Sequence, residues 1–504
     1  MTSNPTSSWR VAIIGAGVSG LSAAHRLIEL SAKSEHPMEL ILFEAGSRVG
    51  GSIQTKSIGK YLVETGADMF VTDKIWAKSL CERLGLQDRL ISTDEHYRRS
   101  LVLRKGKPVP VPEGFILLSM ASMWSVLTSP IFSPWAKLRL AAEYFVPRRM
   151  TEGDESVASF VRRRLGREVL DRLVQALVGG IYTADPEKLS LRATMPRFLE
   201  MEREYGSLIR ASRRRANQQP HLAIQGSGAR YELFMTLQGG VSELIEALSQ
   251  RVTKSATIRF NEPISTLTSN AVTGRYQLRP NSGLIEEFDA VVVALPSYQA
   301  AELLSGSGAP NQQPTASSAA PLGDLLRKIE YSSTAVVASG HKLIDVRHPL
   351  NAFGLVIPTI ENRQILAVSF ASRKFSGRAP NDGVQLRTFV GGAMQPELLD
   401  KTDDEILAIV RHELADTLGV SGHEEFAIVT RHRHSMPQYH TGHIELIQQI
   451  EKQLSIHPGL ALAGNAYHGV GIPDCIHSGE KAAAQLLATR LQIETSSLQS
   501  SSSS

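Results

Sequence analysis

The pattern of apolar and polar residues near the N-terminus predicts a β-strand, a tight turn, a helix and a second strand in quick succession. Residues 9–14 are uncharged and largely β-branched after Arg10, which is typical of a short buried strand. A glycine-rich stretch follows at 15–20, and residues 21–30 have the apolar spacing of a helix. Residues 39–43 form the next apolar run. This order is that of a βαβ unit, whose two strands lie parallel in one sheet.

The periodicity that follows predicts first helices, then a hairpin, then more helices. An amphipathic helix is expected at 75–92. Residues 100–109 are typical of a β-hairpin that turns at Lys105 and Gly106. From about 113 to 215 the pattern is helical and rich in basic residues.

The second half of the chain returns to strands. A glycine pair at 239–240 opens a helix that reaches Leu248, and residues 257–267 are strand-like. The apolar run 288–296, ended by a proline, is typical of a central parallel strand. Four further strand-like runs predict an antiparallel sheet, at 334–339, 353–357, 365–370 and 385–390.

The C-terminal part adds a capped helix and one more strand–loop–helix unit. Residues 402–405 have the spacing of a capping box, which explains their acidic cluster without a metal. A buried strand at 460–465 precedes a glycine-containing loop and a helix at 474–491. We expect 305–320, rich in Ser, Pro, Gly and Gln, to be a flexible connection.

The N-terminal βαβ unit has the chemistry of a dinucleotide site. Gly15, Gly17 and Gly20 form a GxGxxG, in which they allow a tight turn, a close approach to a pyrophosphate and close helix–strand packing. The helix that follows directs free N–H groups and a positive dipole at the phosphate. The second strand ends on Glu44, whose carboxylate can accept hydrogen bonds from both ribose hydroxyls.

The residues after Glu44 select the nucleotide. Arg48, Gly50 and Gly51 complete an E-x3-R-x-G-G pattern that resembles the flavoprotein amine oxidase superfamily, in which this stretch continues the FAD site. The strand or turn at 61–70 would close that site, and the C-terminal strand–loop–helix unit resembles the superfamily's closing segment. The resemblance therefore implies FAD as the cofactor, bound by Gly15, Ala16, Gly17, Val18, Ser19, Gly20, Glu44, Ala45, Arg48, Gly50, Gly51, Ser52, Gly66, Ala67, Asp68, Met69, Ile258, Gly464, Val470, Gly471 and Ile472.

Length, charge and cysteine content set broad limits. A chain of 504 residues is long enough for about two to four structural units. The net charge of +4 gives no argument for nucleic acid, and no recognisable nucleic-acid module is present. The two cysteines, Cys81 and Cys475, make no disulfide framework, and residues 1–8 lack the apolar region of a secretory signal. We expect a cytoplasmic protein.

One uncharged stretch, 114–136, raises the question of a membrane. Pro130 and Pro134 make it a poor spanning helix. Its aromatic residues and the nearby basic residues fit either a helix that lies at a membrane interface or an ordinary pair of core helices, and the residues leave both open. The arginine runs 162–164 and 213–215 are interpreted as solvated faces, with anionic lipid as the alternative.

The histidines of the C-terminal part do not predict a metal site. His432, His434, His440 and His443 are spaced so that they can chelate, but no cysteine or carboxylate joins them and Pro437 argues for a loop. We expect no metal. Cys475 is interpreted as an ordinary thiol near the flavin, with covalent attachment to the flavin as the alternative.

Four further motifs carry a more specific resemblance. Residues 182–190, 156–166, 436–443 and 474–476 resemble segments of the oxygen-dependent protoporphyrinogen and coproporphyrinogen III oxidases, and the resemblance covers about residues 10–490. It implies that FAD removes six electrons from a porphyrinogen in three cycles, with O₂ reduced to H₂O₂ each time, in haem biosynthesis. No residue is expected to be a catalytic acid or base. A peripheral membrane contact and a homodimer are compatible with the family.

The resemblance also implies the substrate residues. Val356 and Phe389 would line an apolar slot for the tetrapyrrole. Mitochondrial and plastid members place a propionate-binding arginine where Ser100 aligns, so Arg99 is the candidate here, although a shift of one residue on a strand turns a side chain to the other face. The choice between protoporphyrinogen and coproporphyrinogen stays open.

Proteins with other activities share this scaffold. An amine oxidase would need an aromatic cage at the flavin, for which only Tyr467 is available; a carotenoid-type desaturase and an FAD-free prenyl-GTPase escort are the remaining alternatives. We expect an α/β fold in which a Rossmann-like FAD-binding domain of the glutathione-reductase type is interleaved with an α+β substrate domain and a helical, membrane-associating insert. The expected boundaries are 10–95, 228–300 and 436–494 for the FAD-binding domain, 96–215 for the insert, 301–435 for the sheet domain and 495–504 for a disordered tail.

Overall fold

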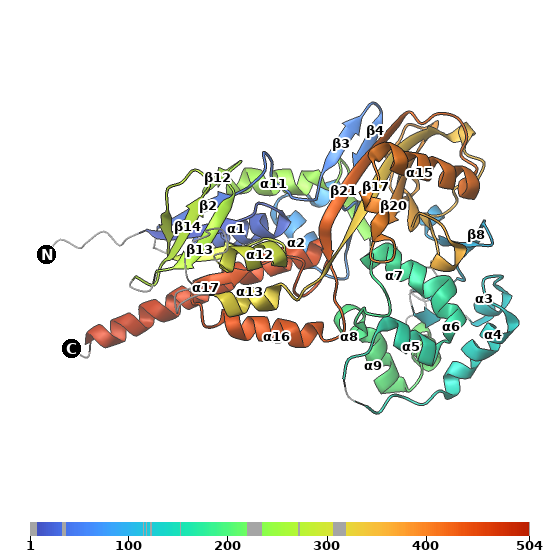
Figure 1. Ribbon diagram of the computed structural model, residues 1–504, viewed down its shortest axis with the longest axis horizontal. Helices are drawn as coiled ribbons and strands as arrows, with labels where there is room; N and C mark the ends of the chain where they lie inside the picture. The colour runs from blue at the N-terminus through green and yellow to red at the C-terminus, as the bar shows by residue number, and fades with distance from the viewer. Residues whose placement is uncertain are drawn as a thin grey trace.

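A five-stranded parallel sheet occupies one end of the molecule (Figure 1). The computed structural model describes residues 8–32, 37–113, 115–116, 118–120, 123–151, 153–218, 234–270, 273–305 and 319–502. The strand order is β12-β2-β1-β16-β22, drawn from Thr257–Arg259, Met38–Phe43, Trp9–Ile14, Ala290–Val293 and Leu460–Leu462. The expected βαβ unit is present, because β1 and β2 pair in parallel from Trp9 opposite Met38 to Ile14 opposite Phe43.

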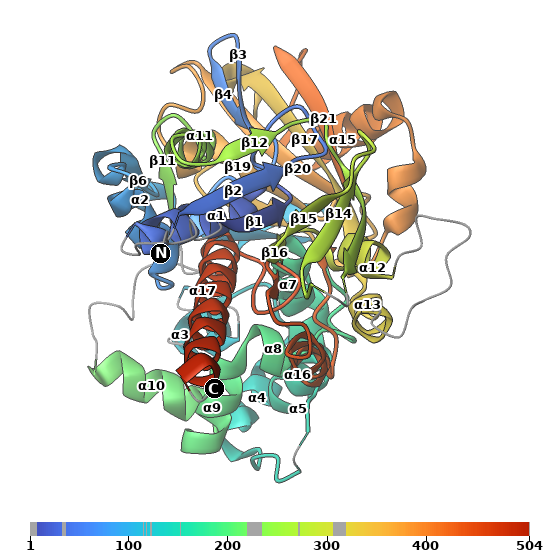
Figure 2. The same cartoon turned by 90° about the vertical axis from the view of Figure 1, so that its left-hand side faces the viewer.

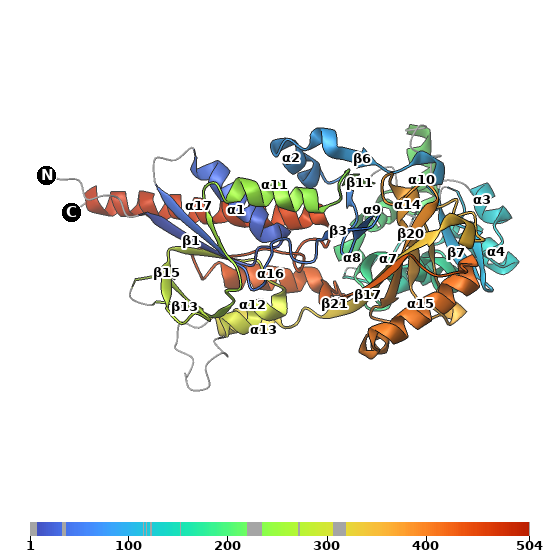
Figure 3. The same ribbon diagram turned by 90° about the horizontal axis from the view of Figure 1, so that it is seen from above.

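Helices cover one face of this sheet and a smaller sheet with helices covers the other. Figure 3 shows α1 and α17 side by side on the first face, where they share a core with two other helices, α2 and α11. These four helices are Val18–Ser31, Ile472–Ser502, Trp76–Arg83 and Ser242–Val252. The second face carries β13, β14 and β15 with α12, α13 and α16, namely Ile264–Ser269, Tyr276–Pro280, Glu286–Phe288, Ser297–Leu304, Ala320–Leu326 and His443–Leu454.

A seven-stranded sheet lies at the other end of the molecule, beside a group of helices (Figures 1 and 2). Its order is β21-β17-β20-β19-β18-β7-β8, and all its pairs are antiparallel except β18 with β7. The strands are Phe426–Pro437, Tyr331–Lys342, Gly383–Gly391, Ala367–Phe370, Gly354–Val356, Ser100–Arg104 and Lys107–Pro110. The hairpin turns at Lys105 and Gly106, both in the left-handed region, as the sequence predicts. It pairs into this sheet and not with the helical insert in which we placed it.

Short elements connect the two ends. The hairpin β3–β4 and the three-stranded sheet β5-β11-β6 comprise Thr55–Ile58, Tyr61–Glu64, Phe70–Val71, Phe234–Leu237 and Leu90–Ser92. Helices α14 and α15, Ala371–Lys374 and Asp403–Leu418, flank the large sheet. The Thr402 hydroxyl accepts from the Glu405 N–H and the Glu405 carboxylate accepts from the Thr402 N–H, which confirms the capping box.

The region 113–218 is mainly helical and has its own apolar core. It begins with the small strands β9 and β10 and continues through α3 to α10, at Phe115–Ile116, Ser119–Met120, Met123–Thr128, Pro134–Ala141, Val157–Arg164, Arg167–Val169, Gln175–Tyr182, Leu191–Thr194, Pro196–Tyr205 and Leu208–Gln218. Within 114–136, Ile131 and Phe132 are buried in this core, whereas Trp124 and Trp135 are about four-fifths exposed (76% and 80%). No helix among the described residues is long and apolar enough to cross a membrane.

Three expectations about secondary structure are wrong in part. The helix expected at 75–92 ends at Arg83, because Gly85 turns into the left-handed region, and Leu90–Ser92 form a strand. The strand-like run 257–267 is two strands in different sheets, separated by a left-handed Asn261 and by Pro263. The connection 305–320 falls mostly on 306–318, outside the described residues.

The C-terminal tail is helical where we expected disorder. Helix α17 runs to Ser502, so 495–502 continue a helix that already packs along α1, and the last two residues lie outside the described part. Serine is only modestly poorer than alanine in a helix, so extending an existing helix through serines costs little.

The arginine run 162–164 does not form one solvated face. Successive helical residues point about 100° apart, so the three side chains diverge. Arg162 is exposed, Arg163 is half-buried and Arg164 is completely buried, where it pairs with the equally buried Glu143 and donates to the Val146 and Gly206 carbonyls at 2.9 Å. In the second run, Arg213 and Arg214 are exposed as expected.

The Arg164–Glu143 pair should be a major determinant of the stability of the helical region. Arg164→Met leaves the Glu143 carboxylate buried without its cation, and we expect the free energy of unfolding to fall by about 3–5 kcal/mol. Arg167→Met, which removes an exposed arginine from a surface pair with Asp171, should leave it unchanged within error. Urea denaturation measures the free energy of unfolding of both variants. Equal values for Arg164→Met and Arg167→Met would contradict the role given to the buried pair.

Candidate functional site

The glycine turn between β1 and α1 is packed backbone against backbone. Gly15 has φ +99°, and a Cβ there would lie 2.6 Å from the Ala294 carbonyl oxygen. A Cβ on Gly20 would lie 1.9 Å from the carbonyl oxygen of Gly15 itself. A Cβ on Gly17 would meet nothing within 4 Å. The middle glycine therefore faces open space at the start of α1, and no side chain caps that helix, which leaves its N–H groups directed at that space.

Glu44 and the glycine pair 50–51 close the turn from the other side. The Glu44 carboxylate accepts from the backbone N–H groups of Ala16 and Gly46 at 2.9 and 2.8 Å. The Gly50 N–H donates to the Ala16 carbonyl at 2.8 Å. Arg48, which we expected to bind the cofactor, donates to the carbonyls of Val49, Gly51 and Ile53. These hydrogen bonds hold the shape of the glycine turn.

A cavity of about 710 Å³ opens at the carboxyl ends of β1 and β2. Ile14, Gly15, Phe43, Glu44 and Ala45 form one wall. The other wall comes from residues that the sequence analysis did not select, namely Glu262, Pro263, Ile264, Ser265, Leu295, Gln299, Glu302 and Leu303. Its size and its place at the strand ends suit the adenosine part of a dinucleotide.

Ile258 is not part of this wall. It lies on β12 opposite Leu42 and packs partly buried against the core. The chain reaches the cavity four residues later, after the turn at Asn261. Cofactor binding by Ile258 stays a prediction.

The second glycine loop, 464–472, is held by one tyrosine. The Tyr439 hydroxyl donates to the Asn465 carbonyl at 2.6 Å and accepts from the Gly469 N–H at 2.8 Å. Asp474, in the first turn of α17, accepts from Lys74 at 2.6 Å and from the Gly471 N–H at 3.3 Å. The predicted residues Val470, Gly471 and Ile472 therefore stand where this loop meets the start of α17.

Close packing brings α17 onto the glycine turn. A Cβ on Gly479 would lie 2.1 Å from the Ser19 carbonyl oxygen, so α17 and α1 touch through their backbones. Cys475 lies in the same contact, and burial raises the pKa of its thiol to about 12. A thiol with such a pKa is protonated near neutral pH and is a poor nucleophile, which fits the interpretation of Cys475 as an ordinary buried thiol.

The loop 66–69 lies beneath the seven-stranded sheet. A Cβ on Gly66 would lie 1.9 Å from the Ser52 carbonyl oxygen, which joins this loop to the glycine pair at 50–51. Above it, Arg387 of β20 contacts both the Gly66 carbonyl and the Asp68 carboxylate. His432 of β21 contacts the Thr65 carbonyl at 2.8 Å. The sheet thus forms a roof over the segment that leads away from the nucleotide site.

Val356 and Phe389 lie on that roof, in one row across the sheet. Val356 is opposite Ala367, and Ala367 is opposite Phe389. Phe389 shares its face with Arg387, whose Cζ lies 5.6 Å from the ring centre. Both Val356 and Phe389 are partly exposed. That they line a slot for the substrate stays a prediction.

Arg99 is not brought to this row. It precedes β7, is exposed, and its neighbour Ser100 is the residue paired across from Gly354 in the sheet. The flip that a one-residue shift produces on a strand therefore separates Arg99 from Val356 and Phe389.

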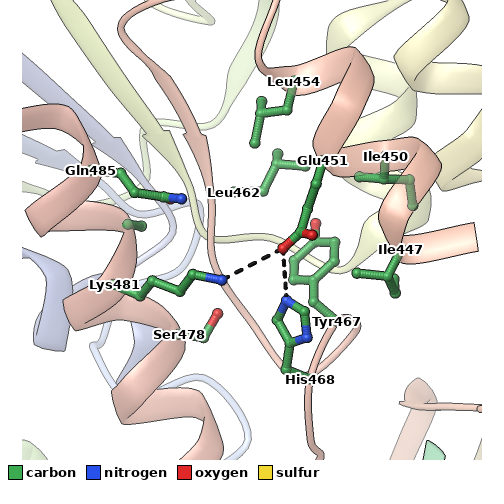
Figure 4. Close-up of a pocket in the computed structure, with 11 residues that line it drawn as sticks. Ile447, Ile450, Glu451, Leu454, Leu462, Tyr467, His468, Ser478, Lys481 and Gln485 are labelled. Carbon is green, nitrogen blue, oxygen red and sulfur yellow. Dashed lines mark hydrogen bonds and ion pairs between the residues drawn. The ribbon is translucent and has the colours of Figure 1, made fainter. Parts of the chain in front are cut away.

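A second, smaller pocket lies between α16 and α17. Figure 4 shows Glu451 pointing toward both His468 and Lys481, at 3.1 and 3.5 Å, with Tyr467 beside them. Its volume of about 50 Å³ has room for water but not for a cofactor. Tyr467, the one residue considered for an amine-oxidase cage, lines this pocket.

The C-terminal histidines have other partners. His443 stacks on Tyr439 and contacts the Tyr467 carbonyl at 3.1 Å, and burial lowers its pKa to about 4. The described residues contain no cluster of three or more His, Cys, Asp or Glu arranged to hold a metal.

Comparison with known proteins identifies the scaffold. The family model of flavin-containing amine oxidoreductases matches residues 18–487. This chain belongs to that family. It is 33% identical to a coproporphyrinogen III oxidase of Staphylococcus aureus, over 95% of this chain and 99% of that one, and 27% identical to a mitochondrial protoporphyrinogen oxidase of Nicotiana tabacum, over 98% and 97%. A crystal structure of a putative protoporphyrinogen oxidase from Exiguobacterium sp. 255-15 superposes with a TM-score of 0.80 at 27% identity, over 95% and 98% of the two chains.

The cofactor is FAD. Members of the family contain flavin, and the residues present fit a dinucleotide. The cavity at the strand ends reaches Glu44, and the space beside Gly17 faces the uncapped N-terminus of α1. Gly15 and Gly20 have no room for a side chain, whereas Gly17 leaves room that a phosphate would fill.

This difference between neighbouring glycines gives a test. Gly17→Val places a side chain in the phosphate space without a clash inside the protein, so we expect a folded protein whose FAD content falls by at least tenfold. Gly20→Val clashes with backbone and should lower the unfolding temperature of the protein stripped of FAD. Bound flavin and thermal unfolding, measured on both variants, separate the two effects; full FAD content in Gly17→Val would contradict the assignment.

Proposed function

We propose that this protein is an FAD-dependent porphyrinogen oxidase of haem biosynthesis, acting on coproporphyrinogen III or protoporphyrinogen IX. Near-full-length similarity to enzymes of both names carries the proposal. The row of Val356 and Phe389 above the loop 66–69 supports it, because a tetrapyrrole needs an extended apolar slot next to the flavin.

The protein's part in this chemistry is positioning and exclusion of water. When bound, FAD is the electron acceptor and O₂ reoxidises it, so each two-electron oxidation yields one H₂O₂. Three such oxidations convert a porphyrinogen to a porphyrin. Val356 and Phe389 hold the macrocycle by apolar contact, and the sheet above them keeps water out. We assign no general acid or base.

The chain folds back on itself to build this site. Strands from 9–14, 38–43, 257–259, 290–293 and 460–462 meet in one sheet, which supports a nucleotide domain made of three separated segments, interleaved with the helical insert and the sheet domain. We propose the predicted domain limits with the hairpin 100–110 moved to the sheet domain.

The helical insert contacts a membrane surface. Trp124, Trp135, Phe145 and Met150 are each at least three-quarters exposed, on elements of the insert around α3 and α4. Exposed Arg148 and Arg210 accompany them, the latter stacked on Tyr144 at 4.1 Å. Exposed aromatic residues next to cations suit an anionic lipid interface. These side chains support peripheral membrane association of a cytoplasmic enzyme.

Aerobic turnover of the purified protein tests the proposed reaction. With coproporphyrinogen III and protoporphyrinogen IX in parallel, we expect porphyrin fluorescence to appear together with three H₂O₂ per porphyrin, well above autoxidation. If neither porphyrinogen is oxidised by the FAD-loaded protein, while an amine or a polyene is, the proposal fails.

Vesicle binding tests the lipid surface. Trp135→Ser combined with Phe145→Ser should weaken sedimentation with phosphatidylglycerol-containing vesicles by about tenfold or more, because each buried large apolar side chain contributes about 1.5–3 kcal/mol. Ile344→Ser is the matched control, since Ile344 is 90% exposed but lies on the sheet domain. Equal vesicle binding by the wild type, the double variant and Ile344→Ser would contradict the membrane contact.

A further inference from the structure

Three charged side chains, those of Asp68, Lys374 and Arg387, meet beneath the large sheet. The Asp68 carboxylate lies 2.8 Å from the Arg387 guanidinium and 3.5 Å from the Lys374 ammonium. Arg387 and Lys374 are 2% and 7% exposed. Burying such charges is costly. The contacts of Arg387 with Asp68 and the Gly66 carbonyl hold the loop 66–69, but they use only part of the guanidinium.

The cluster stands on the same face as the predicted substrate residues. Arg387 precedes Phe389 by two positions on β20 and touches its ring. Across the sheet Arg387 is opposite Ser369, and Ser369 is opposite Gly354, which stands two residues before Val356. The polar row of Arg387 and Ser369 therefore runs directly beside the apolar row of Phe389 and Val356.

The charge of this layer is positive. Burial disfavours ionisation of Asp68, but Lys374 and Arg387 outweigh it and hold the pKa of its carboxyl well below the ordinary value. Arg378 is buried nearby with only carbonyl and hydroxyl oxygens as hydrogen-bond partners, and Glu64 is the other buried carboxyl close to it. Three cations thus face two carboxyl groups among these side chains.

Two hydrogen-bond donors on this face are not used within the described part of the chain. The Arg387 Nε–H and the Ser369 hydroxyl have no hydrogen-bond partner within the described part of the chain, although both side chains are more than nine-tenths buried. Buried donors are nearly always bonded, so two adjacent unused donors beside surplus positive charge indicate an anionic acceptor that arrives from outside.

We propose that Arg387 and Ser369 bind a carboxylate of the substrate and thereby favour the porphyrinogen with more carboxylate arms. The inference rests on the proposed function. A propionate arm supplies a charged acceptor on a macrocycle whose rings would lie against Phe389 and Val356. Coproporphyrinogen III carries two propionates where protoporphyrinogen IX carries vinyls, so this subsite selects coproporphyrinogen III. Asp68 keeps the Arg387 guanidinium in place, and Lys374 offsets the carboxylate of Asp68.

Equilibrium binding of the porphyrin products tests the subsite. Coproporphyrin III and its tetramethyl ester have the same ring system, but only the free acid carries charge. We expect Arg387→Gln to weaken binding of the acid by about 10- to 100-fold and to change binding of the ester by less than about twofold, measured by fluorescence quenching. Arg387→Lys should restore most of the loss, and Asp68→Asn, which removes the carboxylate that positions the guanidinium, should weaken binding of the acid by less than Arg387→Gln does.

A matched arginine variant distinguishes loss of the subsite from a general loss of positive charge. Arg411→Gln breaks an arginine–carboxylate pair with Glu424 away from this face and should change neither affinity. The visible flavin spectrum and FAD content are recorded for every variant. The inference is overturned if Arg387→Gln weakens acid and ester equally, or if it alters the flavin spectrum while the acid-to-ester ratio stays constant. Failure of the wild type to bind either porphyrin would instead contradict the proposed function itself.

Discussion

Backbone packed directly against backbone is the constraint on which the cofactor end of this protein depends. Gly20 lies against Gly15, Gly66 against Ser52, and Gly479 against Ser19, each so closely that a Cβ would come within about 2.1 Å of a carbonyl oxygen. These contacts join the first helix, the loop beneath the large sheet and the C-terminal helix. Because no side chain stands between them, the geometry of the site cannot relax by a change of rotamer.

The same contacts explain why the functional residues come from the whole length of the chain. The nucleotide cavity is lined by the ends of β1 and β2, and the proposed substrate slot draws on β18 and β20. The loop 66–69 belongs to both, since Gly66 packs on the glycine turn and Asp68 pairs with Arg387. If the substrate lies in the proposed slot, binding of FAD and placement of the substrate are linked through this one short loop.

Features encoded by neighbouring residues were predictable from the sequence. The glycine turn, the hairpin at Lys105 and Gly106 and the capping box at Thr402 each depend on the local preferences of a few residues. Val356 and Phe389 came from a family resemblance, and the register of the sheet places them in one row. Arg387 was missed although alternation along a strand puts it on the face of Phe389.

Features decided by distant partners were not predictable in this way. Arg164 is buried because Glu143 and Glu202 approach it from other elements. Residues 262–265 line the nucleotide cavity because one left-handed asparagine, Asn261, redirects the chain after β12. The tail is helical because α17 is already held against α1. In each case tertiary contact outweighed local pattern.

A single anaerobic turnover tests the central claim most directly. Oxidised holoenzyme mixed with excess coproporphyrinogen III without O₂ should lose its flavin absorbance in one phase. After the unreacted porphyrinogen is removed, admission of O₂ should restore the absorbance with one H₂O₂ per FAD. Porphyrin formation with no loss of flavin absorbance would contradict the account, because the electrons would then not pass through the FAD that the glycine turn is built to hold.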